Sequence, residues 1–406
     1  MPKKLFGLLL AAILLCGTAA CGGAMFSEPE VSASGVLPGK IAIITDQKDA
    51  YYQGSKERYY SARQLAEEYG PEDIIHFTWP KFWHDSDAED KMRLVMEEIA
   101  NDQEIKILII AYADSGTDAM VSELRKQRND LFIAYAGYNA NNYGAPFVDL
   151  ILNINIPDMK NAIIEQAGKL GAKTLVSFCY SIDDFYNFEL SYDYDDYFEE
   201  LGKLRKKCQE IGLDFVEVHG LYEIQCGSSL HAYMEKNIPK LVEQYGKDIA
   251  FMGLDDDRLL WYCLDGLLYP SPYVDPSPLM IASALFIPAL AEMESSEEFY
   301  YIDNLPHIIA ETRNALKEKN MLGRVSTWPV PADMIFTYAA AEYGVKWING
   351  EVPKDGIDVA VLGQIMTDFI AESTGEEGLG VSLKPLSVDG EVYPNNILVL
   401  MDYMVY

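Results

Sequence analysis

A strand-to-helix junction near the start of the chain, Lys40–Gly54 (KIAIITDQKDAYYQG), constrains the fold most strongly. Its apolar, β-branched residues Ile41, Ile43 and Ile44 predict a buried strand, and the polar residues that follow end that strand just before an amphipathic helix. The chain then repeats this order of strand, polar turn and helix several times. Such alternation predicts an α/β fold with a mostly parallel sheet covered by helices on both faces.

The repeated pattern falls into two successive arrays. After the opening strand, the first array has expected strands at residues 73–77, 107–111, 131–135 and 147–154. The second array begins with an expected helix at residues 157–170. Its strands are expected at residues 174–180, 214–218, 249–252 and 279–285. One hydrophobic core rarely grows beyond roughly 250–300 residues, so two such arrays in a chain of 406 residues predict two doubly wound, Rossmann-like lobes with parallel sheets.

The N-terminus has the pattern of an export signal. Two lysines precede an apolar run at residues 5–15, which is too short to span a bilayer because a span needs ~20 apolar residues. Small residues then lead to Cys21, which resembles the bacterial lipoprotein box, although Thr18 stands where that box usually has Leu. A plain secretory signal is the alternative. We expect residues 1–20 to be a lipoprotein signal peptide and residues 21–39 a flexible tether that follows a lipidated Cys21. The protein would then be exported and anchored to the outer face of the cell membrane.

The net charge of the chain limits the classes of partner that it is expected to bind. The formal net charge is −31 at pH 7. A surface this negative repels the phosphates of nucleic acids and anionic lipid headgroups. We therefore expect no nucleic-acid partner, and membrane contact only through the lipid anchor. The acidic balance favours cationic ligands, or simply keeps an exported protein soluble.

Motifs for metal binding and catalysis are missing from the sequence. Beyond the expected lipidation site Cys21, four cysteines remain without a CxxC pair, so neither a zinc site nor a redox pair is indicated. A disulfide between two of them stays open, and the sequence does not choose among Cys179, Cys208, Cys226 and Cys263. There is no HExxH, GxSxG or GxxxxGK[ST] motif. We expect no metal, no cofactor and no enzymatic activity, although the many paired carboxylates leave a hydrolase open.

Three passages resemble the type I periplasmic-binding-protein family. They are the opening KIAIITDQ, the helix sequence SARQLAEEYG, and residues 149–173 with the ending AGKLGAKTLV. This family includes bacterial sugar- and nucleoside-binding lipoproteins and the ligand domains of the Lac repressor class. The resemblance covers about residues 40–285 and is closest to a group of uncharacterised bacterial lipoproteins. It implies two lobes with a ligand cleft between them, which close by a hinge motion.

In that family the chain crosses between the lobes three times. The resemblance places these crossings near Asn155, Phe286 and Val325. Lobe one would then consist of residues 40–155 plus 286–325, and lobe two of residues 156–285 plus 326–406.

Candidate ligand contacts follow the predicted strands, because ligands of parallel α/β sheets bind outside the carboxyl ends of the strands. Each candidate has a structural alternative. Asp46 could cap a helix, Asp114 and Ser115 could do the same, and the tryptophans could pack in the core. The candidates are Thr45, Asp46, Gln47, Tyr51, Trp79, Trp83, Tyr112, Asp114, Ser115, Tyr138, Asn139, Tyr180, Asp183, Asp255, Asp256 and Trp328.

These observations together predict an extracytoplasmic, lipid-anchored solute-binding protein. It would capture a small polar ligand, such as a sugar or nucleoside, between two hinged lobes and present it to the membrane permease of an ABC-type uptake system. A sensor that docks onto a signalling partner is the first alternative, and a carboxylate-based hydrolase is the second. The sequence leaves the ligand itself open.

Overall fold

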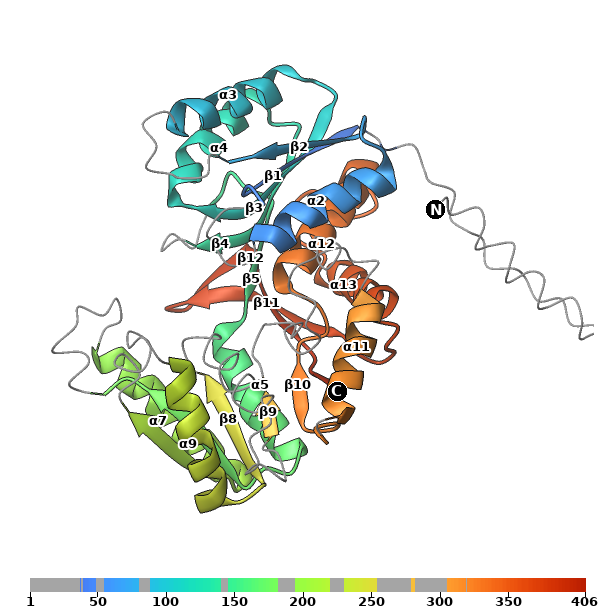
Figure 1. Cartoon of the computed structure of the whole chain (residues 1–406). Coiled ribbons are helices and arrows are strands. Elements are labelled where there is room, and N and C mark those ends of the chain that lie inside the picture. Colours follow the sequence, from blue (N-terminus) through green and yellow to red (C-terminus); the bar gives the residue numbers. More distant parts are fainter. Residues whose placement is uncertain are drawn as a thin grey trace, which may run out of the picture. The chain divides into compact units, whose positions relative to one another are not determined.

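The computed structural model describes residues 37, 39–48, 55–79, 88–139, 145–181, 194–219, 230–253, 279–281, 305–318 and 320–406. All of them belong to one compact unit, Leu37–Tyr406. Their helices and strands form two α/β arrays, which confirms the predicted fold class (Figure 1). Within these residues, none of the helices is both long enough and apolar enough to span a membrane.

The first sheet has seven strands in the order β11-β12-β5-β4-β3-β1-β2. All neighbours are parallel except β11 and β12, which form an antiparallel pair. The strands are β1 Lys40–Thr45, β2 Ile74–Thr78, β3 Ile105–Asp114, β4 Phe132–Asn139, β5 Leu150–Ile154, β11 Val381–Val388 and β12 Glu391–Met401.

Helices cover both faces of this sheet, as Figure 1 shows. On one face Ile41 and Ile43 of β1 join a core with α2 and α12, and on the other Ala42 and Ile44 join a core with α3 and α4. A strand buried on both faces needs a continuous apolar run, which explains the sequence of β1. The helices are α2 Ser55–Tyr69, α3 Ala88–Asn101, α4 Ser115–Gln127, α12 Ala332–Asn349 and α13 Val359–Thr374.

The second sheet has six strands in the order β13-β10-β9-β8-β6-β7, parallel except for the pair of β13 and β10. Its strands are β6 Thr174–Cys179, β7 Asp214–His219, β8 Ile249–Gly253, β9 Leu279–Ile281, β10 Val325–Thr327 and β13 Met404–Val405. Its array also contains the helices α5 Ile156–Lys169, α7 Tyr194–Ile211 and α9 Leu230–Tyr245. Helix α11 Leu305–Glu318 contacts α13, and its Arg313 pairs with Glu376 just after α13. The buried Cys179 and Cys208 of this array are not joined to each other.

Strand pairing assigns the C-terminal part of the chain differently from the expected lobes. We placed residues 286–325 with the first lobe and residues 326–406 with the second. Within the range placed in the second lobe, β12 instead pairs with β5 in the first sheet, whereas β10 pairs with β9 and β13 in the second sheet. The reason is physical: alternate residues of β12, such as Ile397 and Val399, complete the apolar face beside β5.

The chain therefore passes between the arrays near three described positions. It leaves the first sheet after β5, at the expected crossing Asn155, and enters α5. It returns through residues 328–331, between β10 and α12, and passes back once more between β12 and β13. The crossing expected near Phe286 lies outside the described residues.

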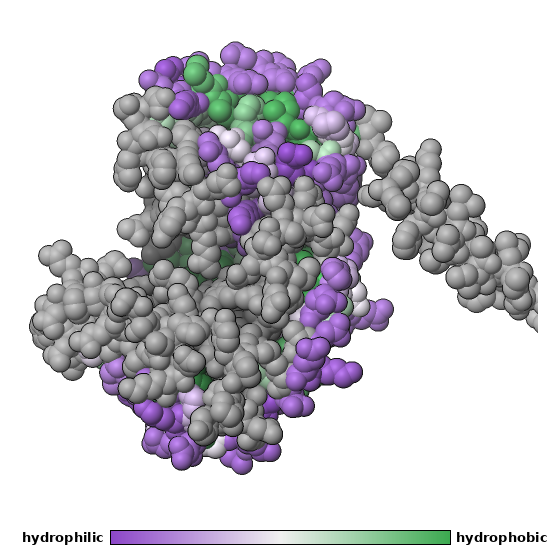
Figure 2. Space-filling model, viewed as in Figure 1, coloured by the Kyte–Doolittle hydropathy of each residue, from purple (hydrophilic) through white to green (hydrophobic). Residues whose placement is uncertain are grey.

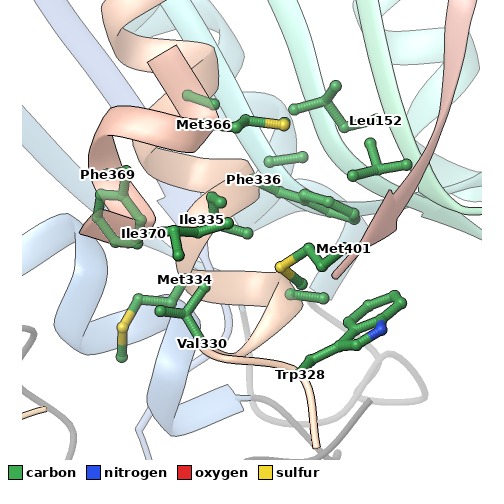
Figure 3. Packing of buried hydrophobic residues seen from close by; sticks show 14 of the residues in the cluster. Leu152, Trp328, Val330, Met334, Ile335, Phe336, Met366, Phe369, Ile370 and Met401 are labelled. Carbon is green, nitrogen blue, oxygen red and sulfur yellow. The ribbon is translucent and has the colours of Figure 1, made fainter. Parts of the chain in front are cut away.

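The C-terminal helices pack closely on the first sheet. Figure 3 shows Phe336 of α12 and Met366 of α13 packed with Leu152 of β5 in one apolar cluster. A Cβ atom on Gly344 of α12 would lie 2.9 Å from Cδ1 of Phe132 in β4. Only glycine therefore lets α12 approach the sheet this closely. On the outside, hydrophilic residues cover much of the described surface drawn in Figure 2.

One buried arginine, Arg128, joins several segments by hydrogen bonds at the amino-terminal edge of the first sheet. Arg128 is 2% exposed and pairs with both carboxylate oxygens of Asp130 at 2.8 and 3.1 Å. It also donates to the carbonyl oxygens of Ile99, Asp102 and Ile105 at 2.6 to 3.0 Å. Hydrogen bonding to Arg128 holds the pKa of Asp130 well below its usual value.

Arg128→Met is expected to lower the free energy of unfolding by about 3–5 kcal/mol, because it leaves the buried carbonyl groups of Ile99 and Ile105 without this donor and removes one of the two cations bonded to Asp130. Urea unfolding of the purified chain measures the change. Arg93→Met is the matched control: Arg93 makes exposed ion pairs with Asp90 and Glu97 within α3, so its midpoint should hardly move. Equal midpoints for the two variants would contradict the role of Arg128.

Candidate functional site

Parallel strands bring their carboxyl ends to one edge of a sheet, and several predicted ligand residues lie there in the first sheet. Thr45 ends β1, and Asp46 and Gln47 follow it. The other predicted positions at this edge are Trp79 directly after β2, Tyr112 and Asp114 at the end of β3, Ser115 at the start of α4, and Tyr138 and Asn139 at the end of β4. The register of β3 and β4 pairs Asp114 with Asn139, so these backbone positions are neighbours.

Two more predicted residues follow strands of the second sheet. Tyr180 follows β6 and is 7% exposed. Its ring lies 5.7 Å from that of Tyr197 in α7, and its N–H donates to the Tyr197 hydroxyl at 3.0 Å. Trp328 follows β10 and is fully buried. The predicted contacts Tyr51, Trp83, Asp183, Asp255 and Asp256 and the lipidation site Cys21 lie outside the described residues.

Thr45 is the buried centre of a small hydrogen-bonded group at the end of β1. Its hydroxyl donates to the carbonyl oxygen of Asp46 at 2.7 Å and lies 2.8 Å from Nε2 of His76 in β2. Because the hydroxyl proton is already used, His76 is the donor in the second bond. Burial, together with the charge of Arg63, lowers the pKa of His76 to about 4. His76 is therefore neutral at pH 7.

Asp46 takes part in a buried ion pair. Its Oδ2 atom accepts hydrogen bonds from Nε and Nη2 of Arg58 at 2.9 and 2.7 Å. The third guanidinium nitrogen, Nη1, donates to Oδ1 of Asp333 at 2.9 Å. The Arg58 side chain is only 2% exposed. One guanidinium thus joins a residue after β1 to the first turn of α12.

The two aspartates and the arginine influence one another electrostatically. Burial raises the pKa of Asp333, and the Arg58 charge opposes this rise. Burial alone would lower the pKa of Arg58, but the charges of Asp333 and Asp46 raise it above its usual value. Arg58 therefore stays charged and compensates both carboxylates.

Arg58, His76 and Asp333 were missed by the sequence analysis. Arg58 lies one helical turn before Ala62 and two turns before Leu65, so it is on the buried apolar face of α2. A charged residue on a buried face is a signal in the sequence that could have identified it. For Asp333 no local signal exists, because its partner is far away in the sequence. From the sequence we considered Asp46 as a helix cap and did not predict that it pairs with an arginine.

The two tryptophans are core residues. Trp79 is 1% exposed and belongs to the core beneath α3 and α4, whereas Trp328 belongs to the core of α12 and α13, at the edge seen in Figure 3. The indole Nε1 of Trp328 is buried and has no acceptor among the residues described. Within the same residues, no cluster of three or more His, Cys, Asp or Glu side chains could hold a metal ion.

The two parallel α/β arrays, joined by several crossings, define a type I periplasmic-binding-protein fold. The chain belongs to the family described as "Protein of unknown function (DUF3798)", whose pattern matches residues 40–326. No curated protein matches the sequence.

Solved structures are similar in fold. A protein from Clostridium difficile 630 described as a transcriptional regulator has a TM-score of 0.69 and 19% identity, over 91% of this chain and 99% of that one. A sugar ABC substrate-binding protein from Bordetella parapertussis 12822 has a TM-score of 0.44 and 9% identity, over 91% and 92%. A periplasmic sugar-binding protein from Legionella pneumophila has a TM-score of 0.40 and 13% identity, over 77% and 96%.

The depressed pKa of His76 makes stability depend on pH. In the unfolded chain His76 has an ordinary pKa near 6.5 and binds a proton below that pH. In the folded chain it binds this proton only below about pH 4. Stability is thus fully present above about pH 6.5 and falls between pH 6.5 and 4, by on the order of 2–3 kcal/mol. His76→Gln keeps a donor near Thr45 and does not titrate, so its stability should fall less over this range in urea unfolding at several pH values. Identical pH slopes for the two proteins would refute the assignment.

Proposed function

We propose that the protein is a lipid-anchored, extracytoplasmic solute-binding protein that captures a small polar ligand for an ABC-type uptake system. The observation that carries the proposal is the position of polar and aromatic residues directly after strands of two separate parallel sheets. Thr45, Asp46 and Gln47 follow β1 in the first sheet. Tyr180 and Trp328 follow β6 and β10 in the second. In open α/β sheets this is where ligands bind.

The two arrays suit a hinged receptor. Each array has its own sheet and helices, and the described crossings between them are short, such as residues 402–403 between β12 and β13. Hinges of this kind need only a few residues that absorb the change in backbone angles. Closure around a ligand would bring contacts from both sheets to it. We propose binding without chemical turnover.

The proposed contacts include both polar and aromatic groups. Hydroxyl, amide and carboxylate groups bind sugar hydroxyls or amines, and aromatic rings stack on sugar rings and nucleobases. Trp328 adds a specific possibility, because a buried N–H without an acceptor costs about 1–3 kcal/mol and a ligand acceptor would recover that cost. The positions at the ends of β3 and β4, and Tyr51, Trp83, Asp183, Asp255 and Asp256, complete the proposed set.

Thermal-shift screening of sugars, nucleosides, amino acids and vitamins, with native mass spectrometry of the purified protein, tests the proposal. A true ligand present at 100 times its Kd stabilises the fold by about 2.7 kcal/mol. Trp328→Phe should then weaken binding about tenfold, the effect of losing about 1.4 kcal/mol. Trp347→Phe is the matched control, because Trp347 is also buried but packs on Phe132 at the start of β4. The proposal would be contradicted if no bound species were found and no solute stabilised the protein.

A sensor that presents its ligand to a signalling partner remains the second candidate. The fold serves both roles equally well, and the partner decides between them. Affinity capture of the tagged protein from solubilised membranes should recover permease subunits if uptake is the role. Recovery of a sensor kinase instead would favour the second candidate.

The lipid anchor has its own test. Cys21→Ser is expected to abolish incorporation of labelled palmitate and to release the protein from the membrane fraction. Cys16→Ser is the control and should leave labelling intact, because large leucines precede Cys16. Labelling that survives loss of Cys21 would rule out this anchor.

A further inference from the structure

The second described crossing, at residues 328–331, is held at both ends by hydrogen bonds. At its start, the hydroxyl of Ser326 in β10 accepts from Gln166 at 3.0 Å and donates to the carbonyl oxygen of Met404 at 2.8 Å, so this end is fixed in the second array. At its other end, Asp333 in the first turn of α12 is bonded to Arg58. The crossing itself, residues 328–331, has the sequence Trp-Pro-Val-Pro.

The two prolines make this crossing stiff. Proline fixes its own φ angle near −65° and restricts the residue before it. Few backbone angles between Thr327 and Asp333 are therefore free to absorb a displacement. A shift of the start of α12 must consequently be passed on to Trp328.

Arg58 links this crossing to the end of β1 through full charges. Its guanidinium divides three hydrogen bonds between Asp46 and Asp333. The side chains of Arg58 and Asp46 are 2% and 8% exposed, so water screens this pair weakly, whereas Asp333 is 30% exposed. Any change in the charge or position of the Asp46 carboxylate therefore alters how Arg58 holds Asp333.

We infer that Arg58 is a positioning residue that couples the carboxylate of Asp46 to the crossing at residues 328–331. The inference rests on the proposed function in one respect: Asp46 is a proposed ligand contact. A ligand that binds Asp46 then changes the hold on the start of α12, and through the proline segment it acts on the crossing. Arg58 itself does not need to touch the ligand.

Hydrogen exchange in the ligand-free chain tests the coupling. The amides of Met334 and Ile335 both donate to the carbonyl oxygen of Pro331 at 3.2 Å and report on the start of α12. Asp46→Asn should speed their exchange at least about threefold relative to core amides of β3, since coupled residues interact by 0.5–3 kcal/mol. Asp130→Asn is the matched control: it weakens another aspartate–arginine pair, at the opposite edge of the sheet, and should leave these amides unchanged.

The same Asp46→Asn change, made in an Arg58→Lys variant, distinguishes coupling through Arg58 from a simple loss of packing. Arg58→Lys keeps the charge but cannot bridge two carboxylates with a planar fork of N–H donors. In that background, Asp46→Asn should produce no further increase in the exchange of Met334 and Ile335. An equal increase with Arg58 and with Lys at this position, or no increase in either, would overturn the inference.

The outcome is independent of the ligand screen. If a solute binds but Asp46→Asn leaves the start of α12 unchanged, the coupling is wrong and the proposed function stands. If the exchange results agree with the coupling but no solute ever binds, the proposed function fails alone.

Discussion

Burial of both faces of each central sheet is the constraint on which the structure depends. Helices cover the first sheet on both sides, and its central strands β1, β3 and β4 are mostly apolar for this reason. Polar side chains are left to the strand ends. At the carboxyl edge these side chains are Thr45, Asp46 and their neighbours. At the amino edge they are Arg128 and Asp130, which form an ion pair. The proposed binding site uses the polar side chains that this constraint leaves at the carboxyl edges.

In the proposed account, the Arg58 network stabilises the binding edge and lets it respond to a ligand. A buried arginine with two carboxylates costs desolvation energy, which well-formed hydrogen bonds offset. In this protein the two carboxylates belong to segments that are distant in the chain, one after β1 and one at the start of α12. The network consequently ties the end of the first strand to the segment that connects the two arrays.

Local patterns in the sequence predicted the repeated units well. The run of isoleucines at residues 41–44 forms β1, and Gly171 ends the α5 segment near its predicted position with a φ of +85°. Long-range partners could not be predicted in this way. The pairing of β12 with β5 and the bond of Arg58 to Asp333 join residues more than 200 positions apart, and no local periodicity encodes them. Strands β11 and β12 were therefore placed in the other array, and Asp46 was considered without its arginine.

The central claim is that a solute is held at the carboxyl edges of both sheets. The most direct measurement is a crystal structure of the chain with the solute found by screening. The account predicts contacts from residues after β1 in the first sheet and from Tyr180 or Trp328 in the second. A solute bound elsewhere on the chain, or touching residues of one sheet only, would contradict it.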